Sequence, residues 1–142
     1  MLKLSAMILY RTKIKKFGGS SYKEVIKKAR ASFHVIEKRT KRTVYVRSAY
    51  FKKEKIFLNL FWEHLNQKPP RDRIRRLKFF SCSIDLIEHS KNKPISKPNP
   101  NNKKEILHRF GGMTKESELF YVQIKENTRN KRKDFISVFP EE

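Results

Sequence analysis

The chain has 142 residues, of which 37% are apolar, so it is long enough for one domain with a modest core. Lysine and arginine outnumber aspartate and glutamate 35 to 14, which gives a formal net charge of +21 at pH 7 and a pI near 10.3. With this excess, positive and negative charges cannot balance on the surface. The charge favours nucleic acid as the partner, because basic side chains that contact a polyanion release its counterions.

Residues 1–19 predict a basic N-terminal arm. Its apolar start is interrupted by Lys3 and is followed by basic residues, with no small-residue cleavage site between them. We therefore expect no signal peptide, and with no membrane span elsewhere we expect a cytoplasmic protein that does not contact a membrane. Gly18 and Gly19 separate the arm from a single domain over residues 20–142.

The first helix is expected from Tyr22 to about Ile36. Ser21 and Glu24 stand at the spacing of a capping box, and the apolar residues that follow recur on one face. After a basic turn, residues 43–51 are rich in β-branched and aromatic side chains, which predicts a strand.

Two more helices are expected in the middle third of the chain. Residues 54–66 carry apolar side chains, with His64 among them, at helical spacing until a pair of prolines. Residues 71–90 form the second helix, and Cys82 on its apolar face is expected to be a small buried side chain in a reducing compartment. The basic first turns of this helix suit phosphate contact as well as a solvated surface, through Arg73, Arg75 and Arg76.

The last third of the chain predicts a loop and three strands. Residues 91–104 have the composition of a loop, and residues 105–110 form the first strand. Residues 111–117, which begin with two glycines, make the turn to a second strand over 118–126, and the third strand covers 134–140. The expected class is α+β, with N-terminal helices and a helical hairpin packed on a small antiparallel sheet of about four strands.

Alternation along the strands separates an apolar face from a face open to a ligand. In the second strand Phe120, Val122 and Ile124 are apolar, which leaves Tyr121, Gln123 and Lys125 for the open face. In the third strand, either Ile136 and Val138 point inward while Phe135, Ser137 and Phe139 point outward, or the reverse.

The first strand places two chemically useful residues on opposite sides. His108 shares its side with Ile106 and Phe110, whereas Arg109 shares its side with Leu107. The pattern leaves open which of the two points outward, and a bulge induced by the glycines would bring both to the rim.

RNA cleavage without a metal needs a base for the 2′-hydroxyl proton, an acid for the 5′-oxygen and cations for the phosphate. His108, Arg109, Lys125 and Ser137 could supply these roles on adjacent strands, with Arg47 as a further phosphate contact. No Gly-x-Gly-x-x-Gly, phosphate-binding loop or metal-ligand cluster occurs in the sequence, so we expect no cofactor and no metal.

Four segments of residues 40–140 together carry a resemblance to a known family: Tyr45–Tyr50, Leu107–Phe110, Tyr121–Lys125 and Phe135–Phe139. Their layout resembles the small metal-independent nucleases of the barnase, EndoU, colicin and RelE superfamily (the BECR fold), in their phage-associated branch. The resemblance implies catalytic residues on the exposed sheet face, where Ser137, His108, Arg109 and Lys125 stand, and a ribonuclease toxin or effector of a mobile element. It also implies an acidic neutralising partner, such as an antitoxin or immunity protein.

The expected function is a metal-independent endoribonuclease with His108 as general acid or base and Ser137 or Tyr121 orienting the substrate. The alternative is a non-catalytic RNA- or DNA-binding protein that uses the same basic face, with tyrosines as stacking platforms. A third reading is a mobile-element accessory protein whose charge serves a protein partner. The residues expected to contact nucleic acid are Arg47, Tyr45, Tyr50, Tyr121, Gln123, Arg73, Arg75 and Arg76.

Overall fold

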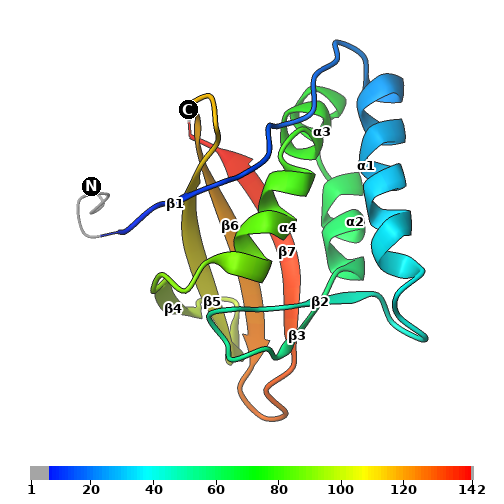
Figure 1. Ribbon diagram of the computed structural model, residues 1–142. Coiled ribbons are helices and arrows are strands. Elements are labelled where there is room, and N and C mark those ends of the chain that lie inside the picture. The colour runs from blue at the N-terminus through cyan, green and yellow to red at the C-terminus, as the bar shows by residue number, and fades with distance from the viewer. Residues whose placement is uncertain (1–6, 142) are drawn as a thin grey trace.

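The computed structural model describes residues 7–141, which form an α+β domain with four helices and a curled mixed sheet of seven strands (Figure 1). The helices are α1 (Tyr22–Glu37), α2 (Asn59–Asn66), α3 (Pro70–Leu77) and α4 (Phe80–His89). The strands are β1 (Tyr10–Arg11), β2 (Tyr45–Arg47), β3 (Lys55–Phe57), β4 (Ile95–Asn99), β5 (Asn102–Met113), β6 (Leu119–Asn127) and β7 (Lys133–Pro140).

The sheet has the order β1-β5-β6-β7-β3-β2, and β4 also pairs with β5. Its long strands β5, β6 and β7 form the expected antiparallel meander, whereas β1 pairs with β5 and β3 with β7 in parallel. The expectation of about four antiparallel strands was therefore wrong in number and direction. The additional strands β1, β2, β3 and β4 are short. They form because they pair with β5, with β7 or with each other, and not because their own sequences alternate between polar and apolar residues.

The helix α1 confirms the expected capping box. The Ser21 hydroxyl accepts the Glu24 backbone N–H at 3.2 Å, and a Glu24 carboxylate oxygen accepts the Ser20 N–H at 3.3 Å. One face of the helix is buried in the core through Val25, Ala29, Phe33 and Ile36.

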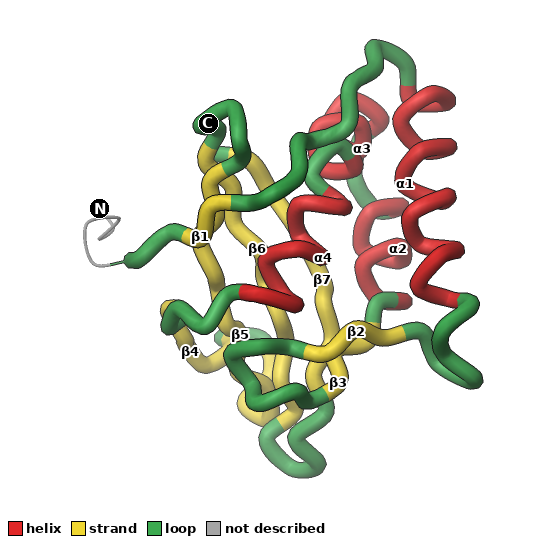
Figure 2. Tube along the Cα trace, viewed as in Figure 1, coloured by secondary structure: helices red, strands yellow, loops and turns green. Residues whose placement is uncertain are grey.

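The helical middle of the chain differs from the expectation at two points. Residues 55–57 form β3, so α2 begins only at Asn59, and the helix expected over 71–90 is broken into α3 and α4 at Phe79 (Figure 2). The break turns two adjacent rings to different neighbours: Phe79 stacks on Phe120 at 5.3 Å, and Phe80 lies 5.3 Å from Phe61. Core packing of both rings thus overrides helix propensity here.

Two further segments were assigned wrongly from their composition. The expected loop over 91–104 contains β4, an edge strand in which Pro98 is tolerated because one side makes no ladder hydrogen bonds. The strand expected over 43–51 stops at Arg47, where Ser48 begins a tight turn: its carbonyl accepts the Lys53 N–H at 2.7 Å, and its hydroxyl accepts the Phe51 N–H at 2.9 Å.

The glycine pair lies inside β5 and does not form the expected turn, which instead runs from Thr114 to Glu118. The reason for glycine is close packing. A Cβ on Gly112 would lie 2.5 Å from the Phe120 ring and 2.9 Å from the Leu86 side chain, and one on Gly111 would overlap the Met7 sulfur.

Gly112→Ala is therefore expected to lower the free energy of unfolding by about 1–3 kcal/mol, because the Phe120 ring must move within a filled core. Urea denaturation followed by circular dichroism measures it. Gly18→Ala is the matched control, since no atom lies within 4 Å of its added Cβ. Equal stability of the two variants would contradict the packing explanation.

The described part of the expected arm, residues 7–19, packs on the domain. Tyr10 pairs with Gly112 in the sheet, and the Lys13 N–H donates to an Asp85 carboxylate oxygen on α4 at 2.8 Å. Residues 1–6 lie outside the described part of the chain.

An aromatic cluster between the helices and the sheet forms the centre of the core. Fully or nearly fully buried rings from α1, α2, α4 and β7 meet there, with Phe61 stacked on Phe135 at 4.8 Å. Cys82 is buried as expected, and burial raises the pKa of its thiol to about 11. Within residues 7–141, no helix combines the length and apolar character that a membrane crossing requires.

Candidate nucleic-acid interface

One face of the meander points away from the core and keeps polar side chains. We call it the open face and define it by Arg109, Tyr121, Gln123, Lys125, Ser137 and Phe139. Its central row runs straight across three strands, because Arg109 pairs with Gln123 and Gln123 with Ser137. The assignment for β6 is confirmed, since Phe120, Val122 and Ile124 are buried on the other side.

The strand β7 reaches this face by a bulge that alternation could not predict. Ile124 pairs with Phe135, whereas Gln123 pairs with Ser137, so Ile136 is an extra residue on β7. Phe135 and Val138 are consequently both fully buried, and neither of the two expected alternations is correct.

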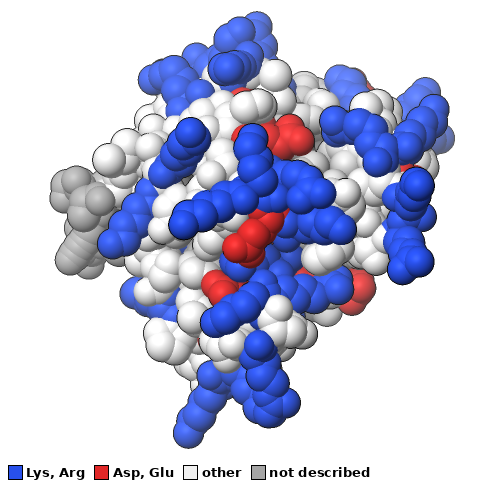
Figure 3. Space-filling model, turned by 60° about the horizontal axis from the view of Figure 1, so that its bottom comes forward, with Lys and Arg blue, Asp and Glu red and all other residues white. Residues whose placement is uncertain are grey.

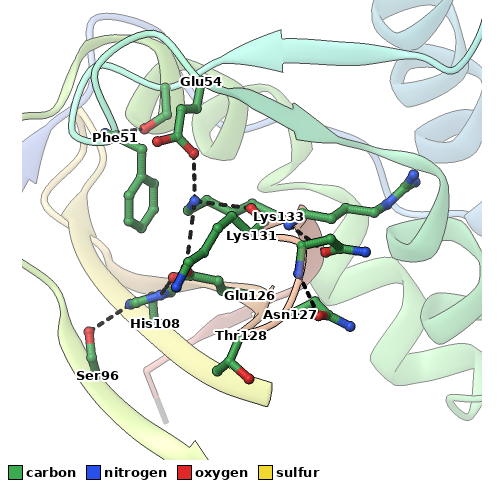
Figure 4. Close-up of polar contacts among 12 residues, drawn as sticks. Phe51, Glu54, Ser96, His108, Glu126, Asn127, Thr128, Lys131 and Lys133 are labelled. Atoms are coloured by element: carbon green, nitrogen blue, oxygen red, sulfur yellow. Dashed lines mark hydrogen bonds and ion pairs between the residues drawn. The ribbon is translucent and has the colours of Figure 1, made fainter. Parts of the chain in front are cut away.

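His108 lies on the opposite side of the sheet from Arg109. Its side chain is 9% exposed, and the Phe51 ring lies against it at 5.0 Å. Nδ1 lies 2.7 Å from the Ser96 hydroxyl of β4, and Nε2 lies 2.7 Å from a carboxylate oxygen of Glu126 on β6 (Figure 4).

The polar contacts of His108 continue into an ionic cluster, which we call the His108 cluster: Ser96, His108, Glu126, Lys133 and Glu54. His108 and Lys133 are buried, whereas Ser96 and Glu54 are exposed. The Lys133 ammonium is buried and lies 2.5 Å from a Glu54 oxygen and 3.8 Å from a Glu126 oxygen. It also donates to the Lys131 carbonyl at 3.2 Å. Through the contact between Glu54 and Lys133, the cluster links the turn after β2 to the start of β7 (Figure 4).

The structure thus separates the four residues expected to act together. Arg109, Lys125 and Ser137 share the open face, and His108 does not. The expected bulge at the glycines is also absent, because β5 and β6 keep one register from Glu105 to Met113.

Arg109 is the cation of the central row, and it is exposed. Among residues 7–141 it makes no ion pair with a carboxylate; its guanidinium lies 3.5 Å from the Gln123 amide oxygen, 4.9 Å from the Phe139 ring and 5.8 Å from the Tyr121 ring. Burial, followed by the nearby Glu141 carboxylate, raises the pKa of Tyr121 to about 12, so its hydroxyl stays protonated. Lys125 differs from Arg109 in having Glu105 at 3.4 Å.

Arg76 on α3 completes the open face at the β7 edge. It donates through Nη1 to the Ser137 hydroxyl at 2.7 Å and to the Val138 carbonyl at 3.2 Å. Nε donates to Asp72 at 3.1 Å, so the guanidinium is held in one position.

The other residues expected to contact nucleic acid are spread over three places. Arg73 donates to the Lys68 and Asn66 carbonyls at the end of α2, and Arg75 lies 3.4 Å from Asp72. Tyr50 packs against Phe51 and Phe110 on the helix side. At the β2 and β3 edge, Tyr45 is flanked by two cations, Lys55 at 4.7 Å and Arg47 at 5.4 Å.

The basic surface extends to the lower end of the molecule. The β4–β5 and β6–β7 turns meet there, because the Thr128 N–H donates to the Lys104 carbonyl at 2.9 Å. In Figure 3, Lys and Arg side chains project over this end, and the few acidic side chains in view lie between them.

His64 on α2 was treated in the sequence as part of an apolar stripe, but it lines a pocket at the edge of the open face. The pocket is formed by Phe61, His64, Leu65, Lys68, Arg76, Ile136 and Ser137. Partial burial, then the charges of Lys125 and Lys68, lowers the pKa of His64, and Glu63 opposes the shift. The sequence shows only that His64 lies on a helix one turn before Lys68. It does not show which strand α2 packs against, so it could not place His64 beside Ser137.

No family model, curated protein or solved structure matches the chain. The open face must therefore be interpreted from its own residues. Within residues 7–141, no three His, Cys, Asp or Glu side chains gather as a metal site would require. The open face and its edge carry cations, hydroxyl groups, an amide group and the partly buried His64.

Proposed function

We propose that the protein binds RNA through its phosphate backbone on the open face. The observation that carries the proposal is the exposed Arg109 guanidinium, which has no carboxylate partner among residues 7–141 and stands in the middle of a polar row. Arginine without an acid partner is available for charge-assisted hydrogen bonds to phosphate oxygens. The net charge of +21 supplies the long-range attraction.

The rings of the face support phosphate contact more than base stacking. Arg109 lies over both rings of the face, 4.9 Å from Phe139 and 5.8 Å from Tyr121. A base could stack on these rings only by displacing the cation, whereas a phosphate can approach the cation as it stands. We therefore expect weak dependence on nucleotide sequence and strong dependence on salt.

This proposal adopts the binding function and removes His108 from any direct role. The His108 ring is on the other side of the sheet and both its nitrogens have side-chain partners, so an RNA on the open face does not reach it. The acidic antitoxin or immunity protein that the nuclease resemblance implies would compete for the same cations.

The test is the affinity of purified protein for a fluorescent single-stranded RNA, measured by anisotropy between about 0.05 and 0.2 M salt. Arg109→Gln is expected to weaken binding about 3–10-fold and to reduce the slope of log affinity against log salt by about one. Arg39→Gln, an exposed arginine just after α1, is the matched control and should change both quantities less. Equal effects of the two variants would show that binding depends on overall charge and not on the open face.

A further inference from the structure

His64 differs from the other three histidines of the chain in its partners. Each of those three is paired with a carboxylate: His34 with Glu37 at 2.8 Å, His89 with Asp85 at 2.9 Å and His108 with Glu126 at 2.7 Å. No hydrogen bond or ion pair of the His64 ring occurs among residues 7–141, which contain all four histidines. His64 is thus the histidine whose ring nitrogens remain available to a ligand within this part of the structure.

The surroundings of His64 are cationic. Arg76 and Lys68 line the same pocket, and Lys125 is close enough for its charge to act on the ring. Because Arg76 donates to the Ser137 hydroxyl, the hydroxyl hydrogen of Ser137 can in turn be donated to another oxygen. Two cations, one hydroxyl donor and a histidine therefore surround one pocket at the edge of the open face.

We propose that this pocket is a metal-independent RNA-cleaving centre in which His64 is the base, Arg76 and Lys68 hold the phosphate and Ser137 donates to it. The proposal rests on the proposed function, since RNA must first bind the open face. It replaces His108 by His64 as the catalytic histidine.

The reaction needs no co-reactant. His64 takes the proton of the 2′-hydroxyl, the 2′-oxygen forms a bond to phosphorus, and the bond from phosphorus to the 5′-oxygen breaks. The leaving 5′-oxygen takes a proton from solvent, and His64 later returns its own proton to solvent. The products are a 2′,3′-cyclic phosphate and a 5′-hydroxyl. DNA lacks the 2′-hydroxyl and cannot react in this way.

Burial and the neighbouring charges favour the base form of the ring. Partial burial, then the charges of Lys125 and Lys68, lowers the pKa of His64 from its ordinary value, and Glu63 opposes the shift. A base is active when deprotonated, so cleavage should persist through neutral pH and fall as the pH drops through this lowered pKa.

The experiment incubates labelled single-stranded RNA, and DNA of the same sequence, with the full-length protein in EDTA, followed by analysis of the fragment ends. Wild type should cut RNA and leave DNA intact. His64→Ala should cut about 10²–10⁴-fold more slowly, the loss typical of a missing general base. His34→Ala is the matched control, because His34 is an exposed histidine on α1, and it should cut like wild type.

Anisotropy in the same samples separates the two proposals. RNA that is bound by wild type but stays intact, or is cut equally by His64→Ala, overturns the catalytic proposal and leaves RNA binding in place. RNA that is neither bound nor cut overturns both. Circular dichroism checks the fold of His64→Ala; if this variant is unfolded, His64→Gln and the pH profile of the wild type decide, and a rate independent of pH from about 5 to 8 would count against His64.

Discussion

Lys133→Met is expected to lower the free energy of unfolding by about 3–5 kcal/mol, because it removes a buried cation and leaves the largely buried Glu126 carboxylate without it. The Lys133 side chain is 4% exposed and the Glu126 side chain 13%. Methionine fills a similar volume but leaves the Glu126 carboxylate with His108 as its remaining partner and leaves the Lys131 carbonyl without its donor. Urea denaturation monitored by circular dichroism measures the change.

Two further variants show whether charge is the cause. Lys23→Met removes an exposed lysine of α1 and should change stability by less than about 0.5 kcal/mol. Combining Lys133→Met with Glu126→Gln should recover part of the loss, since the buried carboxylate is then neutral. A stable single variant would mean that methionine packs as well as the ion pairs do.

Phe80→Ala is expected to cost a similar amount, about 3–5 kcal/mol, for an apolar reason. The Phe80 ring is fully buried and lies 5.3 Å from Phe61, 5.5 Å from Trp62 and 6.5 Å from both Phe33 and Phe135. Truncation would leave a cavity where α1, α2, α4 and β7 meet, and rings on four elements cannot all collapse into it.

The same denaturation measurement tests this packing. Val35→Ala is the control, because Val35 is 62% exposed on α1 and should alter stability by less than about 0.5 kcal/mol. Phe80→Leu should fall between Phe80→Ala and wild type. A loss for Phe80→Ala no larger than that of the control would contradict the central place of this ring in the core.

The environments of His108 and His64 separate the two functional hypotheses. His108 is held between Ser96 and Glu126 next to a buried lysine, which is the arrangement of a structural histidine. His64 is partly buried in a pocket that Lys68 and Arg76 also line, and its ring has no hydrogen-bond partner among residues 7–141, so the catalytic proposal is built on His64. The placement of both depends on which elements pack beside them.

Several features followed from the sequence because they depend on local pattern. The capping box located the start of α1, and alternation in β6 identified Tyr121, Gln123 and Lys125 as the outward set. The α+β class and the three-strand meander were also predicted, since long periodic segments carry their own signal.

The failures share one physical cause, which is that the deciding partner is distant in sequence. The glycines of β5 are required by Phe120 and Met7, not by a turn, and the break at Phe79 follows from two separate ring contacts. Short strands such as β3 and β4 form because β7 and β5 offer them hydrogen bonds.

By itself, the sequence determined the charge of +21, the main periodic elements and the residue types available on the surface. The tertiary structure decided which of them meet. A β-strand sends adjacent residues to opposite faces, so the pairing of β5 with its neighbours placed Arg109 outward and His108 inward. The packing of α2 and α3 against β7 then brought His64 and Arg76 to Ser137, which lies 73 residues after His64 and 61 after Arg76, a separation that no local pattern connects.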